Sequence, residues 1–207
     1  MPFDPNDTEQ DVFEGAAKEL YFTVSTENLV ATEGVCVLKG PDGLIFKRNF
    51  THIRENGESK ITLDKGLRDG KYTLLYFKVD QIDGERSAAE EEVDDKESYG
   101  MGCKFSVSGT TTTVESTYNE DFGMYGSGSE TDPFTVSSYS HLLNLAELAN
   151  DANTNCMLDS TYHYAQECDI DMDFASWRVA DGYGWDPIGC SNLTPCRGHY
   201  HGKGQKI

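Results

Sequence analysis

Three aspartates alternate with other residues in the C-terminal part of the chain, at Asp169, Asp171 and Asp173. Alternate residues of an extended strand point to the same face, so an extended segment here would place three carboxylates together. Carboxylate oxygens are the ligands that Ca²⁺ prefers, which makes this segment a candidate metal site. The glycine and the distal glutamate of an EF-hand loop are missing, so a structural role for these carboxylates is the alternative.

Two cysteines and two histidines follow, in the order Cys190, Cys196, His199 and His201. Thiolate and imidazole groups are the usual ligands of Zn²⁺, but this spacing matches no standard zinc finger. Cys190 and Cys196 are also the closest cysteines in the sequence, so a disulfide that staples a loop is a second hypothesis. The even number of cysteines permits disulfides without fixing their pairing. The other four are Cys36, Cys103, Cys156 and Cys168.

Aromatic residues are frequent in the same region and form a candidate ligand-binding surface. Aromatic rings can stack on sugars, although they more often fill apolar cores. The candidates are Tyr162, Tyr164, Trp177, Tyr183, Trp185 and Tyr200.

Motifs that would indicate catalysis are missing from the sequence. There is no Gly-x-Ser-x-Gly nucleophile elbow, no His-Glu-x-x-His metalloprotease motif and no phosphate-binding loop. The sequence therefore predicts a protein that is not an enzyme and that needs no cofactor, with calcium at the three aspartates as a candidate ion.

Composition restricts the partners and the location. The formal net charge is −19, which disfavours nucleic acid and anionic membranes because both are bound by basic surfaces. No stretch of the sequence has the roughly 18 apolar residues of a membrane span. Residues 1–11 are acidic and lack an apolar core, so they do not form a signal peptide. The chain is either cytoplasmic or has lost its export signal through processing.

The first half of the chain must provide the scaffold, and its pattern is that of an antiparallel β-sandwich. Turn signals such as Pro41-Asp42-Gly43 and Ser108-Gly109 separate short segments rich in β-forming residues. We predict a flexible lead over residues 1–17, the β-sandwich over residues 18–118 and a linker over residues 119–130. The expected strands are residues 20–25, 34–38, 44–50, 60–63, 71–79, 102–107 and 110–114.

The C-terminal part, residues 131–207, is predicted to be α+β. Asp132 and Pro133 introduce an extended segment. Ser137 or Ser138 can then cap a helix over about residues 138–150. The helix has an apolar stripe made by Leu142, Leu145, Ala146 and Ala149.

Five ordered motifs in residues 126–207 resemble the N-terminal cap and first coil of the right-handed parallel β-helix in bacterial surface proteins with GLUG-type repeats. Departures from that pattern are Cys196, His201 and Lys203 in place of Phe, Asp and Asn. The residues that carry the resemblance are Gly126, Gly128, Asp132, Pro133, Phe134, Val136, Leu142, Leu145, Asp169, Ile170, Asp171, Trp185, Pro187, Ile188, Gly189, Gly198, Tyr200, Gly202, Gly204 and Ile207.

The resemblance extends to adhesin-like lipoproteins of gut anaerobes, and the run from Leu63 to Leu75 resembles prealbumin-like, or more broadly Ig-like, sandwiches. It implies a truncated β-helix with an exposed last strand, and structural turn roles for Asp169 and Asp171. It also implies a secreted or cell-surface module for adhesion that binds an extracellular glycan or a surface protein. The alternative is an accessory, non-catalytic domain of a secreted peptidase or polysaccharide-degrading enzyme, which catalytic motifs elsewhere in the parent gene would reveal.

Overall fold

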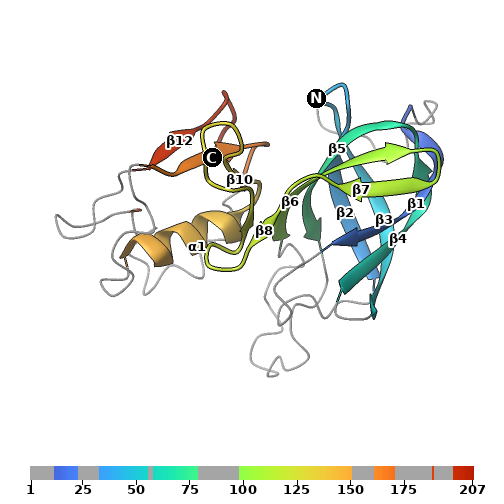
Figure 1. The fold of residues 1–207 in the computed structure, drawn as a ribbon, viewed down its shortest axis with the longest axis horizontal. Helices are drawn as coiled ribbons and strands as arrows, with labels where there is room; N and C mark the ends of the chain where they lie inside the picture. Colours follow the sequence, from blue (N-terminus) through green and yellow to red (C-terminus); the bar gives the residue numbers. More distant parts are fainter. Residues whose placement is uncertain are drawn as a thin grey trace.

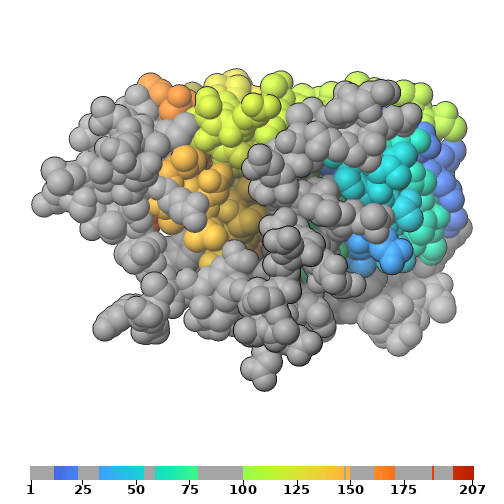
Figure 2. All heavy atoms as spheres, turned by 90° about the horizontal axis from the view of Figure 1, so that it is seen from below, coloured from blue at the N-terminus to red at the C-terminus, as the bar shows by residue number. Residues whose placement is uncertain are grey.

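The computed structural model describes residues 12–22, 33–55, 58–78, 98–150, 161–170, 188 and 198–207. Within these ranges the protein is mainly β, as predicted: a large antiparallel sheet is followed by a smaller part with one helix and a parallel sheet. Figure 1 shows these two parts side by side. In the space-filling view of Figure 2, the N-terminal strands lie at the right and the residues of the helix at the left.

The antiparallel sheet has the strand order β1-β4-β3-β2-β5-β6-β7, and each predicted strand of the first half overlaps one of these strands. The ends of two predicted strands, residues 23–25 and 79, lie outside the described residues. Most strands extend beyond the predicted bounds because backbone pairing with the neighbouring strand continues through residues that are not strong β-formers. The strands are β1 (Glu14–Phe22), β2 (Glu33–Lys39), β3 (Ile45–Glu55), β4 (Glu58–Leu67), β5 (Gly70–Lys78), β6 (Ser98–Ser108) and β7 (Thr111–Val114).

The sheet curls until its two outer strands meet, so it is nearly a barrel (Figure 1). The hydroxyl of Thr112 on β7 donates a hydrogen bond of 2.7 Å to the carbonyl oxygen of Glu19 on β1. This corrects the predicted sandwich, in which two separate sheets would face each other. The physical cause is curvature: register shifts in the pairs β1–β4, β2–β5 and β5–β6 bend the strands.

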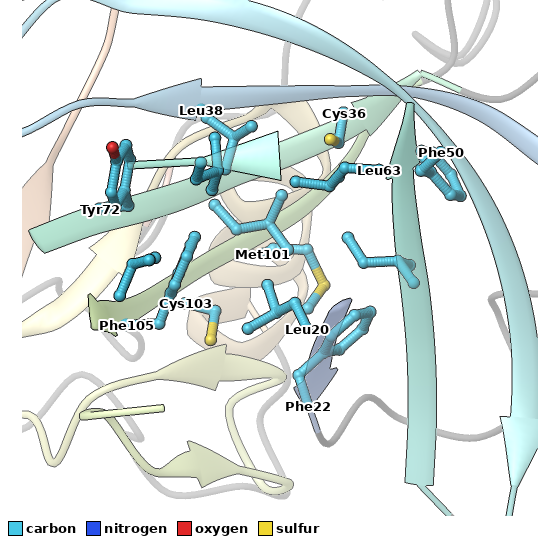
Figure 3. Packing of buried hydrophobic residues seen from close by; sticks show 14 of the residues in the cluster. Leu20, Phe22, Cys36, Leu38, Phe50, Leu63, Tyr72, Met101, Cys103 and Phe105 are labelled. Carbon is cyan, nitrogen blue, oxygen red and sulfur yellow. The ribbon is translucent and has the colours of Figure 1, made fainter. Parts of the chain in front are cut away.

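The interior of this curled sheet is an apolar core supplied by alternate residues of its strands. Figure 3 shows Leu20, Leu38 and Met101 directed toward one another between the strands. Aromatic rings fill one end, where Phe13 stacks on Phe46 with ring centroids 4.1 Å apart. Burial of this apolar surface is the main favourable term in folding.

Two segments expected to be irregular are folded. Strand β1 begins at Glu14 and Phe13 is buried, so the lead predicted for residues 1–17 ends earlier; residues 1–11 lie outside the described residues. The predicted linker overlaps a small hairpin of β8 (Tyr118–Asn119) and β9 (Met124–Tyr125). Its apolar side chains explain this, because Phe122, Met124 and Tyr125 are all buried.

The C-terminal part contains the predicted helix, α1 (Tyr139–Asn150), and a three-stranded parallel sheet in the order β10-β11-β12. The strands are β10 (Phe134–Val136), β11 (His163–Gln166) and β12 (His199–His201). They are in register, with Phe134 beside Tyr164 and Tyr164 beside Tyr200. In the described part of the chain, no helix has the length and hydrophobicity needed to cross a membrane.

Candidate functional site: an outer hollow and the junction beside it

Every second side chain of β2 points outward from the curled sheet. These outward side chains form two groups, one at each end of the strand. Val37 and Lys39 contact the C-terminal part, where Val37 packs with Leu75 of β5 and Cys168. Glu33 and Val35, at the other end of the same row, line a hollow. The junction between the two parts and the hollow therefore occupy the same outer face of the curled sheet.

The hollow has a volume of about 610 Å³ and lies over β1, β4, β3 and β2. Side chains that point outward from the sheet supply most of its lining residues. The walls carry polar side chains, as the outward positions of an antiparallel sheet with one buried face usually do, although apolar atoms supply more than half of the lining surface. The polar residues that line it are Lys18, Glu33, Asn49, Thr51, Thr62 and Asp64.

Asp64, one of the lining residues, takes part in three hydrogen bonds. Its Oδ2 accepts a hydrogen bond of 2.9 Å from Nδ2 of Asn49, and its Oδ1 accepts one of 2.8 Å from the backbone N–H of Lys65. Its carbonyl oxygen accepts a bond of 3.0 Å from Nζ of Lys18. The hollow thus presents donors, acceptors and hydroxyls, and Lys18, Asn49 and Asp64 are held by hydrogen bonds, a combination suited to a ligand with many polar groups.

The junction is held by a serine and a histidine at the start of α1. The hydroxyl of Ser137 donates a 2.5 Å hydrogen bond to the carbonyl oxygen of Leu75 on β5. The backbone N–H of Ser137 donates to Nδ1 of His141 at 3.1 Å. Both side chains are buried, and burial lowers the pKa of His141 to about 4, so its ring is neutral. This serine–histidine pair has no access to a substrate and serves packing.

Strand β6 approaches the junction closely at Gly100. A Cβ at this position would meet the hydroxyl of Ser138 and lie 2.8 Å from Nε2 of His141. The backbone N–H of Gly100 donates to Oγ of Ser140 at 2.9 Å. Glycine at this position therefore allows the helix start to rest directly on the strand.

A buried carboxylate with two lysines completes the junction. Glu167 accepts a hydrogen bond of 3.0 Å from Lys39 of β2 and one of 2.5 Å from Lys203, which follows β12. Burial raises the pKa of Glu167, but the hydrogen bonds from Lys203 and Lys39 outweigh it and hold this pKa below its ordinary value. The ion group ties the sheet, the end of β11 and the C-terminal turn together.

The aromatic candidates do not form a common exposed surface among the described residues. Tyr164 is buried in the core between the parallel sheet and α1, and Tyr162 is half-buried against Phe122. Tyr200 is 40% exposed, and its hydroxyl donates to Oε1 of Gln166 at 3.0 Å. Trp177, Tyr183 and Trp185 lie outside the described residues.

The metal candidates are placed only in part. Oδ1 of Asp169 accepts a 2.8 Å hydrogen bond from the backbone N–H of Lys206. Asp171 and Asp173 lie outside the described residues. Within the described ranges, no three histidine, cysteine or acidic side chains are arranged to hold a metal ion together.

The cysteines that the structure describes are buried free thiols: Cys36, Cys103 and Cys168. Burial raises the pKa of each thiol to about 12, so all three are protonated at neutral pH and poor nucleophiles. The predicted disulfide between Cys190 and Cys196 lies outside the described residues, as does Cys156.

The hollow was not among the sites predicted from the sequence. Alternation along β2, β3 and β4 does indicate which side chains point outward, but it gives no sign of where the outer face is concave. The residues that line the hollow come from β1, β2, β3 and β4, and only the pairing of these strands brings such distant positions in the sequence together.

Searches against protein-family models, curated proteins and solved structures found no match to this chain.

Proposed function

We propose that the protein is a non-enzymatic module of a secreted or cell-surface protein, and that it binds a glycan in the hollow over β1, β4, β3 and β2. The observation that carries this proposal is the hollow itself, in which polar side chains are set into a lining whose surface is largely apolar. Its walls combine an amide, two hydroxyls, two carboxylates and an ammonium group, with Asn49 and Asp64 held by a mutual hydrogen bond. Sugars present alternating donors and acceptors that such a surface can satisfy.

The chemistry of the buried nucleophiles supports a binding role. The described thiols are protonated and enclosed, and the hydroxyl of Ser137 is directed to the carbonyl oxygen of Leu75. General base catalysis needs a base within reach of a substrate proton, and His141 is enclosed at the junction.

The second part of the proposal concerns the C-terminal part, which we take as the opening of a right-handed parallel β-helix. The support is the in-register parallel pairing of β10, β11 and β12 together with the resemblance in residues 126–207. In a β-helix each coil also contributes to faces other than the sheet that these strands form, and the segment between β11 and β12 would supply them. An experimental structure in which the segment between β11 and β12 packs as a separate globular unit would contradict this part.

The binding proposal is tested with the full chain on a glycan array, followed by calorimetry on any glycan that binds. Replacing Thr51 by valine keeps the shape of the side chain and removes its hydroxyl, so it should weaken binding roughly tenfold, the equivalent of about 1.4 kcal/mol. Thr113→Val is the matched control, because Thr113 is an exposed strand residue on β7 outside the hollow. Its affinity should equal that of the wild type.

Two results would refute the binding proposal. One is an array without any bound glycan at high protein concentration. The other is a glycan whose affinity is the same in wild type, Thr51→Val and Asn49→Ala, since that ligand would bind outside the hollow.

A further inference from the structure

Three of the five histidines of the chain lie together on one face of the parallel sheet. His163 of β11 is the direct neighbour of His199 on β12, and His201 lies two residues further on, so all three share a face. The rings of His163 and His199 are stacked with centroids 4.6 Å apart, and those of His163 and His201 lie 5.4 Å apart. His163 is distant in sequence from His199 and His201, so only the pairing of β11 with β12 brings the three rings together.

Two ring nitrogens in this group lie close together. Nδ1 of His163 is 3.1 Å from Nε2 of His201, and the contact is exposed to solvent. Zinc binds imidazole nitrogen at about 2.0–2.1 Å, so two imidazoles on one tetrahedral ion place their nitrogens roughly 3.4 Å apart. The separation found here is close to this value. Histidine χ2 is a soft torsion, so small rotations can direct both lone pairs to one point.

We propose that His163 and His201 bind a divalent transition-metal ion, of the zinc or copper type, through Nδ1 and Nε2 respectively. Imidazole is a ligand that suits both ions. In the metal-free pair one ring donates its N–H to the other. On binding, that ring carries its proton on its other nitrogen, so both rings stay neutral, no net proton is released, and water fills the remaining coordination positions.

The surroundings favour a cation and hold the ligands. The pair is carried on adjacent hydrogen-bonded strands, which fixes the backbone positions of both histidines. The ring of His199 stacks on the ring of His163. The chain carries a formal net charge of −19, which raises the local concentration of cations. Because the described residues provide no third ligand here, the site consists of two protein ligands.

The test is calorimetric titration of the full chain, in a buffer free of thiols and other reductants, with Zn²⁺ and separately with Cu²⁺. One ion should bind per chain, and affinity should be higher for Cu²⁺ in accordance with the Irving–Williams order. His163→Gln and His201→Gln each remove one ligand and should weaken binding at least about tenfold. His199→Gln is the matched control: it removes a neighbouring exposed imidazole of the same sheet and should change affinity less than about threefold.

Electron paramagnetic resonance of the Cu²⁺ complex gives a readout independent of affinity. The wild type should show hyperfine coupling to two imidazole nitrogens, and either ligand variant should show one. Binding that is unchanged in His163→Gln and His201→Gln would overturn the proposal, because the ion would then sit on thiols or carboxylates elsewhere. A loss in His199→Gln as large as in the ligand variants, or no saturable binding at all, would also overturn it.

Discussion

His141 occupies an unusual environment for a titratable residue. It lies at the start of α1, accepts a hydrogen bond from the backbone N–H of Ser137 and packs against Gly100 of β6. Its Nε2 has no hydrogen-bond partner among the described residues. Because the site is buried, protonating the ring would place an unpaired charge in the interior, which is why the pKa falls from 6.5 to about 4.

Stability should therefore depend on His141 between pH 6.5 and about 4. In this range the unfolded chain binds the proton and the folded chain does not, so stability is full above pH 6.5 and falls as the pH drops, by up to about 1.4 kcal/mol per pH unit. His141→Gln keeps an acceptor for the Ser137 N–H and does not titrate. Urea unfolding at several pH values should show a smaller loss for this variant. Parallel pH profiles of wild type and variant would contradict the prediction.

At the scale of elements, the bulge in β6 connects the curvature of the sheet to the docking of β10. The register of β5 and β6 shifts between Leu74 and Tyr76, opposite Gly102. Gly102 has a φ of +69°, a left-handed conformation that favours glycine, and a Cβ there would lie 2.6 Å from Cβ of Thr135 on β10. One glycine thus satisfies both the bend of the strand and the close approach of the next part of the chain.

Gly102→Ala should be clearly more destabilising than Gly109→Ala. Both glycines have positive φ, +69° and +60°, so both alanines meet similar backbone strain. Only Gly102 is crowded, because a Cβ at Gly109 meets nothing within 4 Å. Overpacking of this kind costs about 1–3 kcal/mol beyond the shared strain. The measurement is the difference in free energy of unfolding between the two variants, and equal losses would show that packing against Thr135 contributes nothing.

At the scale of the whole molecule, the curled sheet and the C-terminal part are joined by buried contacts. Ser137 reaches Leu75 across the junction, Glu167 binds Lys39, and Cys168 packs on Val37. Hydrogen bonds to a buried charged group contribute more than those between neutral groups. We therefore expect the two parts to unfold together.

The two tryptophans, Trp177 and Trp185, both belong to the C-terminal part of the sequence, so their fluorescence reports on that part. Far-UV circular dichroism reports mainly on the strands of the large sheet. The urea transitions measured by the two probes should coincide in the wild type. In the double variant Ser137→Ala, Glu167→Gln, the fluorescence transition should move to lower urea, because each lost interaction costs roughly 1–3 kcal/mol. Coincident transitions in the double variant would contradict a role of these contacts in coupling.

Much of this protein follows from local sequence. The strands of the first half were predicted from β-forming residues and turns, and the turn at Asp42 and Gly43 is present, with Gly43 at a φ of +83°. The helix bounds followed from Ser138 and the apolar stripe. These features depend on backbone preferences and on the period of apolar residues, which a short window of sequence contains.

The tertiary structure decided what local sequence leaves open. Alternation fixes which side of a strand is buried, but a single curled sheet and two facing sheets bury the same residues, so the pattern predicted a sandwich where the strands form a near-barrel. The same limit applies to the hollow and to the pair His163 and His201, which arise where strands far apart in the chain become neighbours. Sequence alone determined the elements and their buried faces; long-range pairing and strand curvature determined which of their side chains meet.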